Sequence, residues 1–461
     1  MRLPTLVARV CGLLLALVGG VSFAAAANLP DPRPLGRDLA VDLSATEGLV
    51  PPPGENSAGE LTLRQALAQS LLHNPGLAAF SMEVRSREAQ ALQAGLLTNP
   101  ELTVEMENFA GSGEFSGLDA AESTVSLSQL VELGGKRDKR RTAAALEAKL
   151  AGWDYEAKRL DVLTDTAKAF VEVLASQERL TQATELAALA ERFFQTVRAR
   201  VEAGKVSPVE QTRAQVAVAS ARLDAGRAER NLAAARKSLA TLWGDGEPAF
   251  SMAVGALADI EPVPAAERLA TQIEQNPDLA RWATETEQRR AGLKLARAGA
   301  IPDLTVGLGV RNDQASGDNA LVAGVSIPLP VFDRNQGGVA AARAALSKAH
   351  HELQSARSQA LASLGASYRD LASAYAEGIT LKEQILPAAE SAFEAATLGY
   401  QAGKFGFLEV LDAQRTLFEV RGQYLEALTN YHQARAEVER LIGAPLDSPI
   451  AAPEQHQPIH R

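Results

Sequence analysis

Four short stretches of the chain alternate apolar residues with polar or small ones, which is the pattern of a β-strand with two different faces. The first is 102–107, and the second lies around 124–131, after a loop rich in glycine and serine. The third and fourth lie near 304–311 and 321–329. The clearest apolar positions are Leu102, Val104, Met106, Leu304, Val306, Leu308, Val310, Leu321, Ala323, Val325, Ile327 and Leu329. The alternation therefore predicts two strand pairs, one in each half of the chain.

Most of the remaining sequence has helical periodicity. Residues 137–203 contain no proline and a single glycine, Gly152, so they predict one helix about 100 Å long. Its apolar residues recur at an average step of about 3.5, the coiled-coil period. They are Leu146, Leu150, Trp153, Ala157, Leu160, Leu163, Ala167, Phe170 and Leu174. A matching helix is predicted at 338–402, with a seam of Leu361, Leu364, Tyr368, Leu371 and Tyr375.

The two halves of the chain repeat one plan. Asn74-Pro75 recurs as Asn276-Pro277, and Ala203-Gly204-Lys205 recurs as Ala402-Gly403-Lys404, each about 200 residues later. In each half, short helices precede the strand pair, the first beginning at Leu61-Thr62-Leu63, and two long helices follow it. We therefore expect two structural repeats at 61–244 and 263–443, called repeat 1 and repeat 2 below. Proline-rich sequence predicts an extended arm at 28–60, a linker at 245–262 and a flexible tail at 444–461.

The first 27 residues have the pattern of a cleaved signal peptide. Arg2 and Arg9 precede an apolar stretch at 10–21 that is too short to span a bilayer, and alanines follow at 24–27. A short N-terminal anchor helix is the alternative interpretation. The chain's one cysteine, Cys11, lies inside this segment, so the mature protein is expected to have neither disulfides nor thiolate chemistry.

Charge and motif content exclude several classes of function. The net charge of −10 disfavours nucleic-acid binding; it suits the passage of cations, although a solvated surface explains it equally well. We find no phosphate-binding loop, paired metal motif or nucleophile elbow, so we expect neither an enzyme nor a cofactor. His350-His351 are adjacent and point to different sides of a helix, and a flexible tail explains His456 and His460.

Four strands with one apolar and one polar face are too few to close a membrane barrel, and open strand edges cannot lie in lipid. Three chains would supply twelve strands and a water-filled lumen. The predicted fold is therefore mainly α, with long coiled-coil helices forming an α-barrel and four strands per chain closing a small membrane β-barrel as a homotrimer. A soluble coiled-coil protein with two small hairpins is the alternative that the strands leave open.

Several motifs resemble those of the TolC-type outer-membrane factors, and in particular the cobalt-zinc-cadmium efflux branch of that family. They include Leu61-Thr62-Leu63-Arg64-Gln65-Ala66, Val125-Ser126-Leu127-Ser128-Gln129 and Leu133-Gly134-Gly135-Lys136-Arg137. The resemblance covers about residues 61 to 443. It implies a passive exit duct in the outer membrane whose helices reach into the periplasm. The implied partners are a periplasmic adaptor (membrane fusion protein), an inner-membrane resistance-nodulation-division pump driven by protons, and outer-membrane lipid. Divalent heavy-metal cations are the implied cargo; drug or solute efflux and type I protein secretion are alternatives.

The candidate site residues lie at the two helical turns. Glu409 and Asp412 are three residues apart just after the second turn, so they share a helix face. By position they match the acidic rings of the family's closed periplasmic end, where three chains would gather six carboxylates. An ordinary solvated helix start is the alternative explanation. The tips themselves, Gly204, Lys205, Gly403 and Lys404, are expected to contact the adaptor, although most Gly-Lys helix ends are only turns.

Overall fold

The computed structural model describes residues 59–446. The predicted signal peptide with Cys11, most of the N-terminal arm, and His456 and His460 of the tail lie outside these residues. Between Gly59 and Leu446, no helix is long and apolar enough to cross a membrane.

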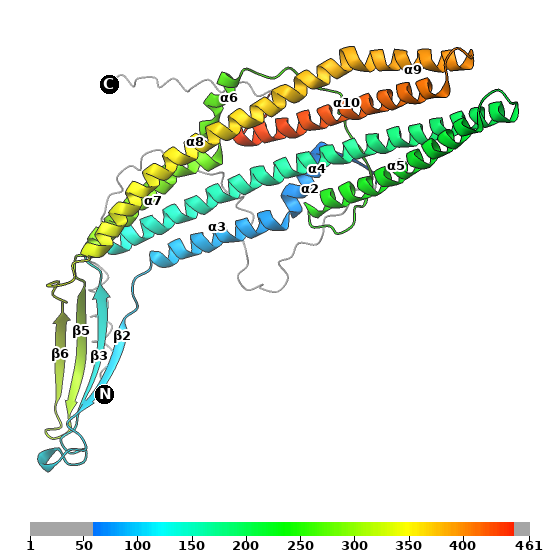
Figure 1. Cartoon of the computed structure of the whole chain (residues 1–461). Coiled ribbons are helices and arrows are strands. Elements are labelled where there is room, and N and C mark those ends of the chain that lie inside the picture. Colours follow the sequence, from blue (N-terminus) through cyan, green and yellow to red (C-terminus); the bar gives the residue numbers. More distant parts are fainter. Residues whose placement is uncertain (1–58, 447–461) are drawn as a thin grey trace. The chain divides into compact units, whose positions relative to one another are not determined.

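The four predicted strands form one antiparallel sheet in the order β2-β3-β5-β6, so the hairpins of the two repeats are joined through β3 and β5 (Figure 1). The strands are β2 Glu101–Glu107, β3 Glu122–Val131, β5 Leu304–Asp313 and β6 Asn319–Ser326. One register row carries Val104, Val125, Val310 and Leu321, all exposed. The next row carries Glu105, Thr124, Arg311 and Ala320. Because successive residues point to opposite faces of a sheet, one face is apolar and the other polar or small.

The fourth strand is shorter than its apolar stripe predicts. It ends at Ser326, and Ile327 and Leu329 lie beyond it. Pro328 and Pro330 explain the difference, because proline has no N–H for the ladder and restricts the residue before it.

Two long helical hairpins follow the two strand pairs. In repeat 1, α4 Lys136–Glu202 runs for 67 residues and α5 Pro208–Thr241 returns. In repeat 2, α8 Gln336–Thr380 leads through a π-helical turn, Leu381–Ile385, into α9 Leu386–Gln401, and α10 Phe407–Ile442 returns. The helix expected at 338–402 is therefore present, but its α-helical hydrogen bonding is interrupted by the π-helical turn. Pro387 is the cause, because its ring and missing N–H do not fit a continuous α-helix, and Leu386 N–H bonds to Leu381 O instead.

Short helices precede the strands in both repeats. Repeat 1 has α2 Leu63–His73 and α3 Pro75–Ala94, and repeat 2 has α6 Ala266–Gln272, a 3₁₀ turn at Ile273–Gln275 and α7 Pro277–Ala298. Asn74 caps α3 and its Nδ2 donates to Leu242 O at 2.7 Å. Asn276 caps α7 and donates to Arg440 O at 2.8 Å. The recurring Asn-Pro pair thus performs the same task in each repeat: it starts a helix and ties it to the end of the returning long helix.

Two further strands were not expected from the sequence. Leu61 and Thr62, predicted to begin a helix, belong to β1 Gly59–Thr62, which pairs in parallel with β4 Phe250–Val254 in the predicted linker. Thr62 then caps α2 in a capping box with Gln65. The loop between β2 and β3 contains a 3₁₀ turn at Gly113–Phe115.

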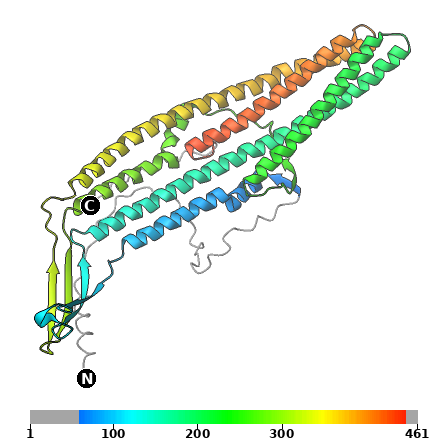
Figure 2. The ribbon, with the colours of Figure 1, turned by 60° about the horizontal axis from the view of Figure 1, so that its bottom comes forward.

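Helix α4 packs against α2, α3 and α5 along one side and α7 and α10 along the other (Figures 1 and 2). Of the predicted seam, Trp153 and Phe170 are buried, while other deeply buried positions, such as Val162 and Val173, lie off it. Trp153 Nε1 donates to Thr284 Oγ1 of α7 at 3.1 Å, which joins the repeats. In the α8 seam Leu364 and Leu371 are buried, whereas Leu361 is exposed. A narrow coiled-coil seam therefore underestimates how many neighbours these helices have.

Candidate functional site

Both long hairpins end in the same turn. Gly204 and Gly403 have left-handed backbones, with φ of 67° and 71°, and Lys205 N–H and Lys404 N–H bond back to Arg200 O and Gly399 O at 2.9 and 2.8 Å. This is the Schellman turn, which favours glycine because a Cβ strains a left-handed backbone. All four tip residues, Gly204, Lys205, Gly403 and Lys404, are exposed. They are therefore accessible in the single chain, as an adaptor contact requires.

The two tips pack against each other through an apolar cluster, which we call the tip core. Its buried members are Val197, Ala214, Ala396, Tyr400, Phe407 and Val410, from both repeats. The Phe407 ring lies between those of Phe193 and Tyr400, with ring centres 6.5 and 6.1 Å away. Both views show the α4–α5 and α9–α10 turns at the same end of the helices (Figures 1 and 2).

Arg200 joins the tips by a second kind of contact. Its Nη2 donates to Tyr400 O and Gln401 O, each at 3.2 Å, at the end of α9, and its guanidinium lies 4.3 Å from the centre of the Tyr400 ring. A cation is favourable at a helix C-terminus and over an aromatic ring. The sequence did not identify Arg200, because an arginine in the last turn of a helix is usually solvated.

Glu409 and Asp412 lie in the first two turns of α10, and both side chains are exposed. Within residues 59–446 neither forms a salt bridge in the single chain. Phe407, Val410 and Gln414 of the same helix are buried, so the two carboxylates stand away from the tip core. The repeat 1 counterpart of Glu409 is Glu210, which is half-buried. The exposed carboxylates of Glu409 and Asp412 can therefore face a lumen or a second chain.

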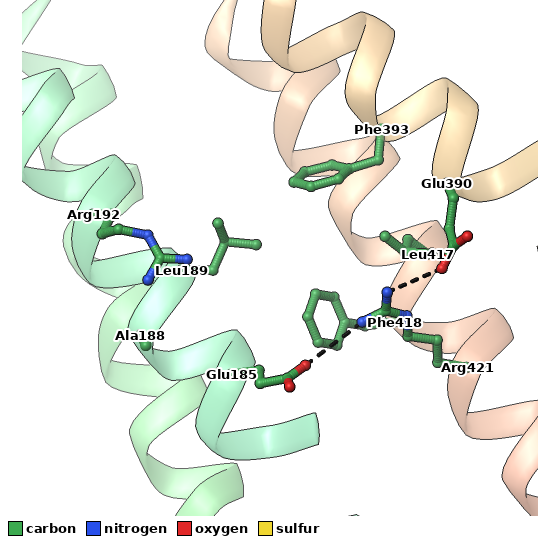
Figure 3. A pocket seen from close by; sticks show the side chains of 9 residues that line it. All are labelled: Glu185, Ala188, Leu189, Arg192, Glu390, Phe393, Leu417, Phe418 and Arg421. Carbon is green, nitrogen blue, oxygen red and sulfur yellow. Dashed lines mark hydrogen bonds and ion pairs between the residues drawn. The ribbon is translucent and has the colours of Figure 1, made fainter. Parts of the chain in front are cut away.

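Farther from the tips, a cavity of about 440 Å³ lies between α4, α9 and α10 (Figure 3). Arg421 spans it, with Nη2 3.1 Å from Glu390 Oε1 and Nη1 3.7 Å from Glu185 Oε2 of repeat 1. Arg222 and Glu191 form the corresponding pair in repeat 1 at 2.9 Å. The cavity is also lined by Arg192 and by apolar groups such as Leu189, Phe393 and Leu417. Because Arg421 is paired with Glu185 and Glu390, these three side chains join α4, α9 and α10.

One arginine network joins the repeats near the other end of α10. Arg440 lies 2.8 Å from Asp161 of α4 and also pairs with Asp278 of α7. Burial lowers the pKa of Arg440, but hydrogen bonds and attraction from these two carboxylates outweigh it and raise the pKa above its usual value. For metals, no group of three or more His, Cys, Asp or Glu side chains in the described part of the chain could hold an ion.

The family model described as "Outer membrane efflux protein" matches residues 66–245 and 269–444. The chain belongs to this outer membrane efflux protein family. The resemblance found in the sequence is thereby confirmed, together with location in the outer membrane and a role as an efflux duct. The family consists of efflux channels, which distinguishes this chain from a soluble coiled-coil protein.

Individual relatives agree with this assignment. The chain is 38% identical to the cobalt-zinc-cadmium resistance protein CzcC of Cupriavidus metallidurans over 410 residues, which cover 89% of this chain and 96% of that protein. It is 26% identical to the pyoverdine export outer membrane protein OpmQ of Pseudomonas aeruginosa, over 84% of this chain and 85% of that protein. The crystal structure of the outer membrane protein VceC from Vibrio cholerae has a TM-score of 0.69 at 20% identity and covers 84% of this chain and 97% of that one.

The predicted fold class is confirmed: a mainly helical chain with two structural repeats, whose structural neighbours are channels of the TolC type. Trimers and barrels are known for this fold. The four-strand sheet has the faces that a barrel wall needs, since the row with Val104 and Leu321 is apolar and the row with Glu105 and Arg311 is not.

Proposed function

We propose that this efflux duct carries divalent heavy-metal cations out of the periplasm. The observation that carries the proposal is the similarity to the cobalt-zinc-cadmium resistance protein, which spans nearly the whole of both chains. The net charge of −10 agrees with a cationic cargo. Export of an organic solute is the second candidate, supported by the more distant similarity to the pyoverdine exporter.

The working duct in this proposal is a homotrimer of this chain. Among residues 59–446, the sheet edges β2 and β6 have no partner strand, and the apolar face of the sheet is exposed. Unpaired backbone groups are costly in lipid, so β6 of one chain must pair with β2 of the next. Three copies then close a twelve-stranded barrel with the row of Glu105 and Arg311 lining the lumen.

Energy and the choice among cationic cargoes come from partners in this account. The exposed turns at Gly204-Lys205 and Gly403-Lys404 contact a periplasmic adaptor, which links the duct to a proton-driven resistance-nodulation-division pump in the inner membrane. Both turns lie at one end of the helices, so one adaptor surface can reach them together. The boundaries of the two repeats at 61–244 and 263–443 and the cleavage of residues 1–27 belong to the same proposal.

We assign the periplasmic gate of this duct to Glu409 and Asp412. Both are exposed near the tip and stand away from the tip core, and three copies of each would surround one narrow mouth. Such a ring attracts cations and repels anions.

Deletion of the gene from its host tests the cargo. We expect the deletion strain to become more sensitive to zinc, cobalt or cadmium, and expression of the chain to restore tolerance. Sensitivity to dyes and antibiotics is the control and should not change. Unchanged metal tolerance together with new sensitivity to organic compounds would contradict the metal cargo, and would favour the solute exporter.

A further inference from the structure

The apolar face of the sheet continues beyond the end of β6. Val325 lies on this face, and every second residue after it is again apolar: Ile327, Leu329 and Val331. These three leave 49%, 80% and 60% of each residue accessible, and Phe332, which follows them, is 91% exposed. Because alternate residues of an extended chain point to the same side, the apolar surface reaches the connection between the sheet and α8.

Strand β3 has the same feature in repeat 1. Leu127 and Val131 lie on the apolar face, and the next alternate position is the exposed Leu133. Leu96 and Leu97, which follow the end of α3 beside this connection, are exposed as well. The surface that faces lipid in the proposed barrel therefore extends to the helices in both repeats.

Basic residues follow immediately where the apolar surface ends. Residues 132–141 hold five basic and two acidic side chains, so this segment is positively charged in a chain whose net charge is −10. In repeat 2, Arg334 stands two residues after Phe332. A positive cluster at one level of an acidic chain favours an anionic partner. We call its six cations the basic collar: Lys136, Arg137, Lys139, Arg140, Arg141 and Arg334.

Part of the basic collar is used to hold the connection together. Arg137 Nε donates to Gly95 O at 2.6 Å, and Arg140 Nε donates to Ala94 O at 3.0 Å, both at the end of α3. Lys136 forms an ion pair of 2.7 Å with a carboxylate of repeat 2. A cation is favourable at a helix C-terminus, so these three side chains have structural partners. They also fix the positions of the cations beside them.

Two arginines of the basic collar are exposed and form no ion pair among residues 59–446. The side chain of Arg141 lies against the end of α3, with its Cδ 3.2 Å from where a Cβ on Gly95 would stand. Arg334 Nε donates to Pro330 O at 3.2 Å, which leaves its two terminal nitrogens available. A guanidinium group with free N–H donors matches the geometry of a phosphate.

The connections that carry these arginines lie side by side. A Cβ on Gly134, after β3, would stand 2.7 Å from the side chain of Ile301, before β5. Asn335, after β6, donates to Ala296 O of α7 at 2.7 Å. All four strands meet the helices at this one end of the sheet (Figure 1). The basic collar therefore lies at the level where the apolar face of the sheet ends.

We propose that Arg141 and Arg334 bind the phosphate groups of anionic phospholipids in the periplasmic leaflet of the outer membrane, with Leu329 and Phe332 among the adjoining acyl chains. Headgroups begin where a lipid-facing apolar surface ends, and the helices of this chain lie on the periplasmic side. The inference rests on the proposed function in one respect, that the apolar face of the sheet contacts lipid. A lipid with a net negative charge is preferred to a zwitterionic one, because the collar is positive.

Counting bound lipids by native mass spectrometry tests the site. The purified full-length duct in detergent is titrated with phosphatidylglycerol, phosphatidylcholine or lipid A. The test variant is Arg141→Gln/Arg334→Gln, and Arg141→Lys/Arg334→Lys keeps the charge. The matched control is Arg230→Gln/Arg369→Gln, because these two arginines are exposed on α5 and α8 and form no ion pair within the described part of the chain. The same spectra give the number of chains in each particle.

The unsubstituted duct should bind phosphatidylglycerol several-fold more tightly than phosphatidylcholine. The glutamine variant at the collar should lose most of this preference, whereas the control and the lysine variant should keep it. Equal binding of the two phospholipids, or an unchanged preference in the glutamine variant, would overturn the site. Arginine-dependent binding that is tighter for lipid A would overturn the assignment to the periplasmic leaflet.

The particle mass separates failure of this site from failure of the duct itself. A glutamine variant that falls apart into single chains, beside an intact control, would show that the arginines bind another copy and would overturn the lipid site. An unsubstituted particle of one chain that still prefers phosphatidylglycerol would refute the proposed trimer and support the lipid site.

Discussion

Single side chains of α4 hold the two hairpins together near their tips. Arg200 caps the end of α9 and covers Tyr400, and Phe193 packs on Phe407. None of these residues stands out in the sequence, because aromatic and basic residues are frequent along long helices. Glu409 and Asp412 were recognisable by contrast, since an acidic pair directly after a Gly-Lys turn is placed by the turn itself.

Replacing Arg200 by alanine should lower the stability of the tip. Two hydrogen bonds to carbonyl groups and one cation–π contact are lost, and we expect a cost of about 1–2 kcal/mol because the side chain is partly exposed. Limited proteolysis measures the effect, with faster cleavage near 203–207 and 402–406 than in the unsubstituted duct. Arg198→Ala is the control, because Arg198 pairs only with Glu202 of its own helix among the described residues. Equal cleavage rates in both variants would contradict a clamp at Arg200.

Replacing Glu409 and Asp412 together by alanine should reduce the cation selectivity of the isolated trimer several-fold. Divalent ions added on the periplasmic side should also block the variant less, because carboxylates close together share a cation favourably. Conductance and reversal potential in planar bilayers measure both effects. Glu419→Ala, an exposed acid farther along α10, is the control. Unaltered block and selectivity would show that the gate lies elsewhere.

At the scale of elements, the strands and long helices followed from their periodicity, and the irregular elements did not. Alternation over several residues identified the four strands of the large sheet. Strands β1 and β4 escaped notice because they are four and five residues long and are surrounded by proline-rich sequence. The π-helical turn at Leu381–Ile385 also escaped, since apolar spacing shows that a helix continues but not how it accommodates Pro387.

The segment after β4 is held to α10 by two neighbouring residues. Tyr431 Oη donates to Glu261 O and accepts from Glu261 N–H, at 2.9 and 3.0 Å. His432 Nε2 lies 2.9 Å from Leu257 O, to which it donates. The predicted linker is thus packed onto repeat 2 over 257–261.

The buried contact of His432 predicts that the protein is less stable at acidic pH. Burial lowers the pKa of His432 below its usual value of about 6.5, aided by Arg435 and opposed by the Leu257 carbonyl and Asp259. Folding therefore favours the neutral ring. The contribution of His432 to the stability of the fold is complete above pH ~6.5, and it is lost as the pH falls through the lower pKa that His432 has in the folded protein. The thermal midpoint should drop more between pH 7.5 and 5.5 for the unsubstituted protein than for His432→Gln. Equal drops would contradict a buried neutral histidine.

At the scale of the whole molecule, one chain supplies only part of the wall of a barrel. In the described part of the chain, the two edge strands of the sheet have no partner, and helices α5 and α9 expose apolar residues. The sequence predicted this incompleteness, because four amphipathic strands cannot close in lipid. The sequence could not show which helices remain exposed for contact with another chain, since that depends on how the two repeats pack through Trp153, Arg421 and Arg440.

Mass measurement of the gently detergent-extracted protein tests the central claim, that three copies of this chain close one duct in the outer membrane. The account predicts that the chain fractionates with outer membranes, requires detergent for extraction and has a protein mass of three chains. A monomer or dimer under the same gentle conditions, or a chain that is soluble without detergent, would contradict it.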